Sequence, residues 1–337
     1  MSSAWQFYLI TLLVYYGVNL ISCWALNLQY GVAGVMNFGF IVFQAIGAYA
    51  GAVLTLGPSS ASGYQSYIAG MTLPWPVPLL VAGVLGALLA LIVGWVVLKP
   101  VRRDFQALLM LVFSIIATTV VSSETGWFNG AAGLAAVPQP FAGSVGGSSL
   151  GYGWFYVGLT AAVCAATYVV IHRLTAAPWA RRLRAVRENP ASASALGINV
   201  HREQLTVFVV GGALAAVSGA LLVQFVGSWA PSGWQYSETF LYFTAIVVGG
   251  LANNAGAGLG AAVVFAGILE TPRFLPKFGT VGGLADALEP MSVGILILAF
   301  LWFRPQGLVP ERRRRPGRRR SVVRMPGLGV VTSRNSK

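Results

Sequence analysis

The residues whose types and spacing suggest a specific task lie in one polar stretch of an otherwise apolar chain. The stretch Arg184–Val200 reads RAVRENPASASALGINV. Asn189 is a good helix N-cap, Pro190 suits the first helical position, and Gly197 suits the residue after the last turn. Because the residues between are mostly Ala and Ser, the spacing predicts a bare helix of about two turns. Such a helix can pack closely into a groove of another protein, although an ordinary capped connector has the same pattern.

Enzymatic chemistry finds little support among the other polar residues. A nucleotide-binding P-loop has Ser or Thr after its lysine. Of the three lysines here, one is followed by Pro100, one by Phe278, and the third is the last residue given. No Ser/His/Asp arrangement or pair of carboxylates is visible. Cys23 and Cys164 have neither CxxC spacing nor a nearby histidine cluster. We therefore expect no catalytic residue, no metal site and no cofactor in this chain.

The composition indicates where these residues must be positioned. Of the 337 residues, 56% are hydrophobic and 9% are charged, and the mean hydropathy is +0.71. A water-soluble domain has about 25% charged residues, so this chain has too little polar surface for one. Its apolar runs are also too continuous for the alternating strands of a membrane barrel. The sequence predicts an all-α, polytopic bundle of transmembrane helices.

The apolar runs predict about nine membrane segments, within a range of eight to ten. Several runs are shorter than the roughly 20 residues that a straight span needs, so we expect glycine-broken or re-entrant helices among them. The predicted segments are 6–27, 33–56, 77–98, 105–122, 153–172, 205–227, 238–251, 257–270 and 290–303.

The polar joints between the segments predict the orientation. If 99–104, 173–204 and the C-terminal tail lie in the cytoplasm, 20 of the 22 basic residues are cytoplasmic. Arg273 and Lys277 alone remain outside, which strongly satisfies the positive-inside rule. This orientation puts the N-terminus and the loop 123–152 on the outer side.

The membrane segments themselves contain almost no ionisable residue. Pumps driven by protons or ions usually carry acidic residues or histidines inside the bundle. In this sequence Glu124, Glu238, Glu270, Asp286 and Glu289 fall at segment ends or in outer loops. If the chain moves a solute uphill, we therefore expect the energy to enter through another subunit, docked on the loop 173–204.

At this point the sequence resembles a known family. Arg184–Val200 is similar to the ATPase-contacting loop in permease subunits of the branched-chain amino-acid ABC importers, a family that also includes permeases for urea and short amides. The positions that match the family motif are Arg184, Ala185, Arg187, Glu188, Asn189, Ala193, Leu196, Gly197, Ile198 and Asn199. Pro190 and Ser192 depart from the usual motif. The resemblance implies that Arg184, Arg187, Glu188, Asn189, Ala193, Leu196 and Gly197 form the contact with the ATPase.

Other motifs resemble the same family, in family order, between about residue 10 and residue 309. They are Tyr30–Gly39, Gln44–Tyr49, Glu124–Gly126 with Gly130–Leu134 and Pro138, Val248–Leu251 with Gly256 and Gly260, and Phe303–Leu308. Chain length and the closing motif favour one of the family's two permease types, whereas GVMNF at 34–38 is closer to the other. We expect residues 1–309 to form the permease domain and 310–337 a disordered tail.

A solute path is expected where two glycine-interrupted stretches, 31–51 and 249–260, occupy corresponding positions of two repeats. Interrupted helices of this kind often flank a transport site, because freed backbone groups can bind the ends of a zwitterion. The candidate side chains are Asn37, Phe38, Gln44, Asn253 and Asn254. Close packing of helices through small residues explains the glycines at least as well.

The resemblance implies a permease that translocates branched-chain or similar small amino acids across a bacterial-type cytoplasmic membrane. Its implied partners are a second homologous permease, two cytoplasmic ABC ATPases that bind the ATP, and an extracytoplasmic binding protein. The alternatives are a urea or short-amide permease of the same family and a passive channel for a small neutral solute.

The C-terminal tail accounts for most of the positive charge. Eleven of the 22 basic residues lie beyond Leu301, where Glu311 is the sole acid. The high pI of 10.3 therefore reflects a tail and does not indicate a nucleic-acid-binding domain. We expect this segment either to rest on anionic lipid or to act as a topogenic tail without a partner.

Overall fold

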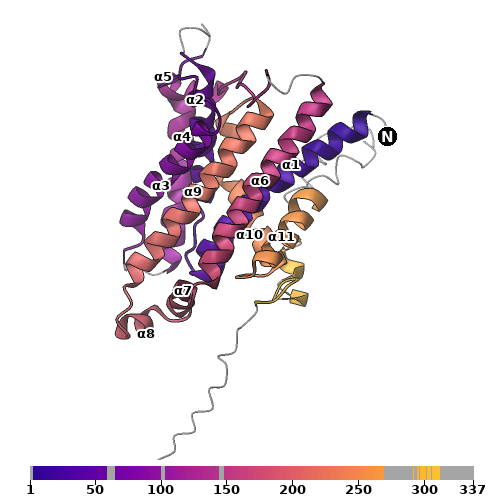
Figure 1. Ribbon diagram of the computed structural model, residues 1–337. Coiled ribbons are helices and arrows are strands. Elements are labelled where there is room, and N and C mark those ends of the chain that lie inside the picture. The colour runs from indigo at the N-terminus through magenta and orange to yellow at the C-terminus, as the bar shows by residue number, and fades with distance from the viewer. Residues whose placement is uncertain are drawn as a thin grey trace, which may run out of the picture.

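The structure is a computed structural model with residues 3–58, 65–99, 103–143 and 148–268 described. Short pieces of the C-terminal region are also described, namely 291, 294–295, 297–300, 302–304 and 306–311. Five helices are long and apolar enough to cross a membrane, among the described residues. The helices lie roughly side by side in one bundle (Figure 1), which confirms the predicted helical membrane fold.

Three helices form the centre of the bundle. They are α1 (Ser3–Leu26), which continues as a π-helix η1 (Asn27–Val32), α2 (Phe40–Leu56) and α9 (Val200–Val226). Most of their side chains are buried. Because the backbone groups of a helix bond to one another, such helices can be apolar on all sides and still lie inside the bundle.

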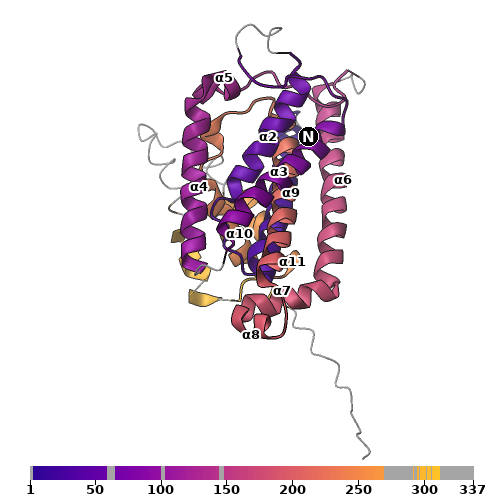
Figure 2. The same cartoon turned by 90° about the vertical axis from the view of Figure 1, so that its left-hand side faces the viewer.

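Three more long helices surround this centre. They are α3 (Val77–Val97), α4 (Arg103–Ser123) and α6 (Ser149–Ala176). Figure 2 shows α4 and α6 standing on opposite sides of the central group. Rows of large apolar side chains on these helices are exposed, such as Ile92 and Leu108. In a membrane protein these rows face lipid or another subunit.

Small residues let the central helices approach closely. A Cβ atom on Gly47 of α2 would lie 2.0 Å from the carbonyl oxygen of Ala216 in α9. A Cβ atom on Gly219 would lie 1.9 Å from the carbonyl oxygen of Gln44. These contacts show that the glycine-interrupted stretch in α2 serves helix packing, as expected for a bundle in lipid.

The C-terminal part of the bundle contains shorter helices. They are α10 (Tyr236–Gly249) and α11 (Asn254–Ala261), and α11 continues as the π-helix η5 (Ala262–Ile268). A Cβ atom on Gly260 would lie 1.8 Å from the carbonyl oxygen of Ala245, so α10 and α11 also pack through glycine.

Loops close one end of the bundle. They contain α5 (Thr125–Phe128) and the short 3-10 helices η3 (Gly130–Ala132) and η4 (Pro231–Gly233). Leu134 and Trp229 exchange backbone hydrogen bonds of 2.6 and 2.7 Å between two of these loops. The other end carries α7 (Pro178–Glu188) and α8 (Pro190–Ala195), opposite the N-terminal end of α1 (Figure 1).

The predicted segments need several corrections. The segment predicted at 33–56 becomes helical only at Phe40, because 33–39 forms a turn. The predicted loop 173–204 is shorter, since α6 reaches Ala176 and α9 begins at Val200. The predicted helix breaks are confirmed at 33–39, before α2 begins, and between α10 and α11. Parts of the predicted segments 257–270 and 290–303, namely 269–270, 290, 292–293, 296 and 301, and the tail from 312 onward lie outside the described residues.

Candidate coupling and translocation site

The loop between α6 and α9 folds as two short helices that lie across the end of the bundle. One face of α7 carries Ala180, Leu183 and Val186, each at most 1% exposed, and its other face carries arginines. This amphipathic pattern fixes α7 against the bundle. Trp179 of α7 also donates its indole N–H to Glu203 of α9.

The helix predicted from Asn189, Pro190 and Gly197 is confirmed as α8. The side-chain oxygen of Asn189 accepts a hydrogen bond of 3.0 Å from the Ser192 amide, as an N-cap does. Gly197 ends the helix with a φ of +82°, a conformation that glycine adopts without strain. Leu196 is 81% exposed, so α8 presents a free apolar tip.

The surface that α8 presents differs in one position from the expectation. Ala193 is only 2% exposed and therefore faces the bundle, whereas 191–192 and 194–197 are exposed. A bulky residue at Ala193 would consequently disturb the packing of α8 before it reached any partner. Glu188 is exposed at the end of α7 and is free to face a docked subunit.

Arg187 connects α7 to the first helix break. Its guanidinium donates to the carbonyl oxygen of Gly31 in η1 and to Glu311 at 2.8 Å. Gly34, at the end of the same break, has a φ of +73°, and a Cβ there would lie 2.8 Å from the Arg187 side chain. Arg187 therefore contacts the break through both its charged end and its stem.

Two further charged residues fix α7, and the sequence motif does not include either of them. Arg103 at the start of α4 donates to the carbonyl oxygens of Val186 and Arg187 at 3.1 and 2.7 Å. A cation at this position satisfies the free carbonyls of a helix C-terminus. Glu311 forms ion pairs with Arg184 at 3.2 Å and Arg187 at 2.8 Å. Only its place as the sole acid beyond Leu301 distinguishes Glu311 in the sequence.

The first break, residues 27–39, is held by amide side chains inside the bundle. The Gln29 amide donates to the carbonyl oxygen of Phe208 at 3.0 Å, and Asn37 donates to the Gln29 side chain at 3.0 Å. The side chains of Gln29 and Asn37 are fully buried. Asn27 accepts a bond of 2.9 Å from the amide of Ala252, which belongs to the second break.

The second break, residues 250–253, is held mainly by backbone contacts. The amides of Leu308 and Val309 donate to the carbonyl oxygens of Val248 and Gly249 at 2.8 and 2.9 Å. A Cβ atom on Gly250 would lie 2.1 Å from the carbonyl oxygen of Val309. The C-terminal segment 306–311 therefore covers this break and ends at the ion pairs of Glu311.

The five predicted path residues lie near these breaks but do not form one cluster of free polar groups. Asn253 caps α11 through the amides of Ala255 and Gly256 at 3.0 and 3.3 Å. Asn254 donates to Thr175 of α6 at 3.2 Å. Their amides thus hold helices together, and their role in solute binding stays a prediction.

The remaining predicted path residues lie in the first break or in α2, directly after it. Gln44 is buried and accepts a hydrogen bond of 3.0 Å from the Tyr242 hydroxyl. Asn37, described above, is bonded to Gln29. Phe38 is half-buried, with its ring 4.9 Å from that of Phe243 between centroids. None of the five predicted residues lines either of the two cavities described next.

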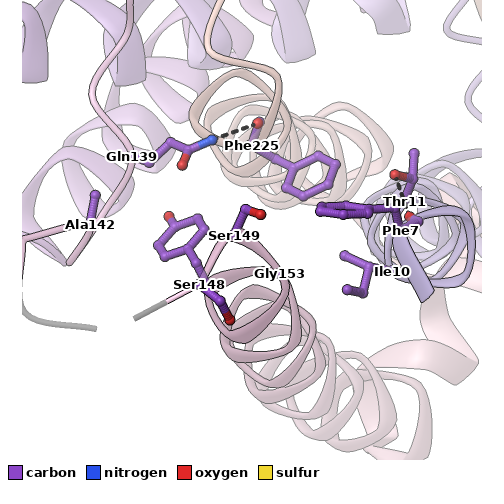
Figure 3. A pocket seen from close by; sticks show the side chains of 10 residues that line it. Phe7, Ile10, Thr11, Gln139, Ala142, Ser148, Ser149, Gly153 and Phe225 are labelled. Atoms are coloured by element: carbon purple, nitrogen blue, oxygen red, sulfur yellow. Dashed lines mark hydrogen bonds between the residues drawn. The ribbon is translucent and has the colours of Figure 1, made fainter. Parts of the chain in front are cut away.

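The larger cavity, of about 520 Å³, lies between the N-terminal parts of α1 and α6 and the C-terminal end of α9. Figure 3 shows it with the rings of Phe7 and Phe225 pointing toward each other at its edge. Gln139, from the predicted outer loop, lies on the other side and donates to the Phe225 carbonyl at 3.4 Å. Hydroxyls of Ser148 and Ser149 complete a mixed polar and apolar lining.

The smaller cavity, of about 290 Å³, lies between α2 and α4 and reaches the loops that contain Phe128 and Trp229. Its lining is almost wholly apolar. The described residues contain no group of three or more His, Cys, Asp or Glu side chains that could bind a metal ion. Cys23 and Cys164 are both buried and free.

Comparison with known proteins identifies the family. The family described as "Branched-chain amino acid transport system / permease component" matches residues 8–271. The probable branched-chain amino acid transport permease protein LivM of Methanocaldococcus jannaschii is 25% identical over 328 residues, covering 89% of this chain and 93% of that protein.

Permease proteins of Escherichia coli named LivM and LivH match as well. The high-affinity permease protein LivM of Escherichia coli K12 is 26% identical and covers 86% of this chain and 67% of its own. LivH of the same organism is 30% identical over 269 residues, covering 75% of this chain and 82% of its own. No solved structure matches. The chain is a multi-pass membrane protein and belongs to the family of permease components of branched-chain amino acid transport systems.

Proposed function

We propose that this chain is the permease subunit of an ATP-driven importer for branched-chain or similar small amino acids. Its relatives are named as branched-chain amino acid permeases. The observation that carries the proposal is the contact of Arg187 with Gly31, because it joins an exposed cytoplasmic loop to a helix break inside the bundle.

The proposed assembly contains three other subunits, and a separate binding protein docks on it. A second permease covers an exposed apolar face, and two cytoplasmic ATPases bind ATP and dock on α7 and α8, one on each permease. The exposed Leu196 tip and Glu188 form part of this contact. A binding protein delivers the solute at the opposite end, to the loop 123–152. The membrane is the cytoplasmic membrane of a bacterial-type cell.

In the proposed mechanism, movement of the cytoplasmic loop is transmitted to the two helix breaks inside the bundle. Closure of the ATPases displaces α8 and α7, and Arg187 transmits the displacement to Gly31 in the first break. Glu311 transmits it to the segment 306–311 and so to the second break. Because Asn27 binds the Ala252 amide, the two breaks move together. The bundle then changes between inward-open and outward-open states.

The Arg-rich tail is proposed to rest on anionic lipid. Each basic residue near such a surface contributes about 1 kcal/mol of attraction. The proposal is tested with the full chain and with vesicles that contain or lack anionic lipid. Binding of the tail to the anionic vesicles is expected to weaken as salt is added.

Reconstitution of the importer in vesicles tests the proposed function. We expect leucine, isoleucine or valine uptake only when both permeases, the ATPases, the binding protein and ATP are present. Solute flux through this chain alone would overturn the proposal in favour of a passive channel. ATP-dependent uptake of urea without uptake of amino acids would favour the urea permease.

The docking surface is tested separately by one pair of variants. Leu196→Ser removes the exposed apolar tip and is expected to weaken ATPase binding several-fold without changing membrane insertion. Arg173→Ala, at an exposed position of α6 outside α7 and α8, is the matched control. Equal ATPase binding by Leu196→Ser and the unaltered chain would remove α8 from the docking surface.

A further inference from the structure

We propose that the apolar cavity between α2 and α4 is a filter that receives the branched aliphatic side chain of the transported amino acid. This inference rests on the proposed import function and extends it, because it places part of the solute specificity in the permease itself.

The lining of the cavity selects for an apolar ligand. None of the described lining residues carries a carboxylate, amine, guanidinium or imidazole, and Thr118 is the only one with an aliphatic hydroxyl. A charged or amide-bearing side chain would lose its hydration there without gaining a partner. The lining residues are Val42, Ala45, Ile46, Tyr49, Leu89, Phe113, Ile116, Ala117, Thr118, Val120, Val121, Phe128, Trp229, Pro231 and Trp234.

The size and rigidity of the cavity limit the ligand to a small one. Its volume of about 290 Å³ lies at the lower end of ligand pockets, which span about 300–1,000 Å³. The ring of Tyr49 packs against those of Phe128 and Trp229, with centroids 4.8 and 5.2 Å apart. The Tyr49 hydroxyl donates to the Trp127 carbonyl, so this aromatic wall is fixed from two sides.

A second observation points to a ligand with an acceptor group. Trp229 lines the cavity and is 3% exposed, yet its indole N–H has no acceptor among the described residues. Buried donors are rarely left without an acceptor, because the loss of hydration is then uncompensated. The carboxylate of an amino acid whose side chain occupies the cavity would supply this acceptor.

The position of the cavity suits an early step of transport, before the solute reaches the helix breaks. It extends along α4 from Phe113 to Val121 and ends beneath the loops of Phe128 and Trp234. Those loops lie at the end of the bundle opposite α7 and α8 (Figure 1). A solute that arrives from the outer side therefore meets the cavity before it reaches the break at 27–39.

Two variants that fill the cavity from opposite walls test the inference. Ala117→Leu extends from α4 and Ala45→Leu from α2, whereas Ala166→Leu on the exposed face of α6 is the matched control. The complete importer is reconstituted with each variant, and ATP-dependent uptake of leucine, valine and alanine is measured at concentrations that saturate the binding protein. Each rate is divided by the rate of the unaltered importer, so the preference of the binding protein cancels.

The filter predicts a loss that grows with side-chain size. Leucine uptake is expected to fall about tenfold more than alanine uptake in Ala117→Leu and Ala45→Leu, since one methylene group in a fitted pocket changes selectivity by about 10–200-fold. In the control variant, the ratio of leucine uptake to alanine uptake is expected to stay unchanged. Equal losses for the three solutes, or unchanged rates, would overturn the filter and indicate that lipid or the second permease occupies the cavity.

Trp229→Phe tests the polar half of the inference with the opposite signature. The ring is kept, but the donor to the carboxylate is lost, so uptake of all three amino acids is expected to fall several-fold with their ratios unchanged. Unchanged uptake would show that this N–H does not bind the solute. Failure of the proposed function is distinguishable, because the unaltered importer would then take up no amino acid.

Discussion

The two helix breaks of the bundle contact each other but are held by different means. The break at 27–39 relies on side chains, namely the amides of Asn27, Gln29 and Asn37 and the guanidinium of Arg187. The break at 250–253 relies on glycine and on the backbone of 306–309. Contacts between side chains tolerate deformation better than close backbone contacts, so we infer that the first break deforms while the second moves with it as a rigid unit.

The largest expected effect comes from the backbone contact of the second break. Gly250 has a φ of +118°, and a Cβ there would lie 2.1 Å from the Val309 carbonyl oxygen. Gly250→Ala combines this clash with backbone strain, and each costs of the order of 1–3 kcal/mol. We expect a clear fall in the thermal unfolding midpoint of the purified protein.

Gly126→Ala provides the control for that measurement. Gly126 has no heavy atom within 4 Å of the position of its Cβ, so its unfolding midpoint should match that of the unaltered chain. If Gly250→Ala unfolds at that same temperature, the second break is not rigid and the comparison fails.

Loss of Arg187 is expected to have the next largest effect, on transport. Arg187→Ala removes the bonds to Gly31 and Glu311, and hydrogen bonds of charged groups contribute about 1.5–3 kcal/mol each. Amino-acid uptake by the reconstituted importer should fall about tenfold or more while ATP hydrolysis continues. Arg173→Ala, an exposed arginine of α6, serves as the matched control, and equal uptake by both variants would contradict the assigned link.

A smaller effect is expected where the two breaks touch. Asn27→Leu removes the acceptor of the Ala252 amide, and an unsatisfied buried donor costs about 1–3 kcal/mol. The unfolding midpoint should therefore fall less than in Gly250→Ala. Thr119→Val, whose hydroxyl bonds only within its own helix, is the reference. A midpoint equal to this reference would show that the breaks are independent.

The smallest effect is expected in the docking loop. Asn189→Ala removes the N-cap of α8, which costs about 1 kcal/mol, whereas Asn189→Gly costs only a few tenths. Hydrogen exchange of the α8 amides should accelerate about fivefold in the alanine variant and little in the glycine variant. Identical exchange in both variants would mean that the cap does not stabilise α8.

The sequence predicts the parts of this structure that depend on local patterns. The caps of α8 depend on Asn189 and Gly197 alone, and close packing at Gly47 and Gly260 depends on small residues in the two glycine-interrupted stretches, so both are confirmed. The π-helix η1 is not predicted, because it depends on Gln29 reaching Phe208 across the bundle.

The partners of the coupling loop are equally hard to predict from the sequence. The ion pairs of Glu311 join residues more than 120 positions apart, and Arg103 binds carbonyls that any residue type can offer. The cavity between α2 and α4 is lined by residues of ordinary membrane composition. The indole N–H of Trp229 lacks an acceptor among the described residues, a property that depends on tertiary packing and has no local sequence pattern.

The central claim is that displacement of α7 reaches the first break through Arg187. The direct test introduces Met36→Cys, at a half-buried position of that break, and measures its alkylation rate in the reconstituted importer without nucleotide and after vanadate trapping. The same protein without the new cysteine gives the background from Cys23 and Cys164. We predict that trapping changes the rate in the chain with Arg187 and leaves it unchanged in Arg187→Ala. An equal change in both proteins would contradict the claim.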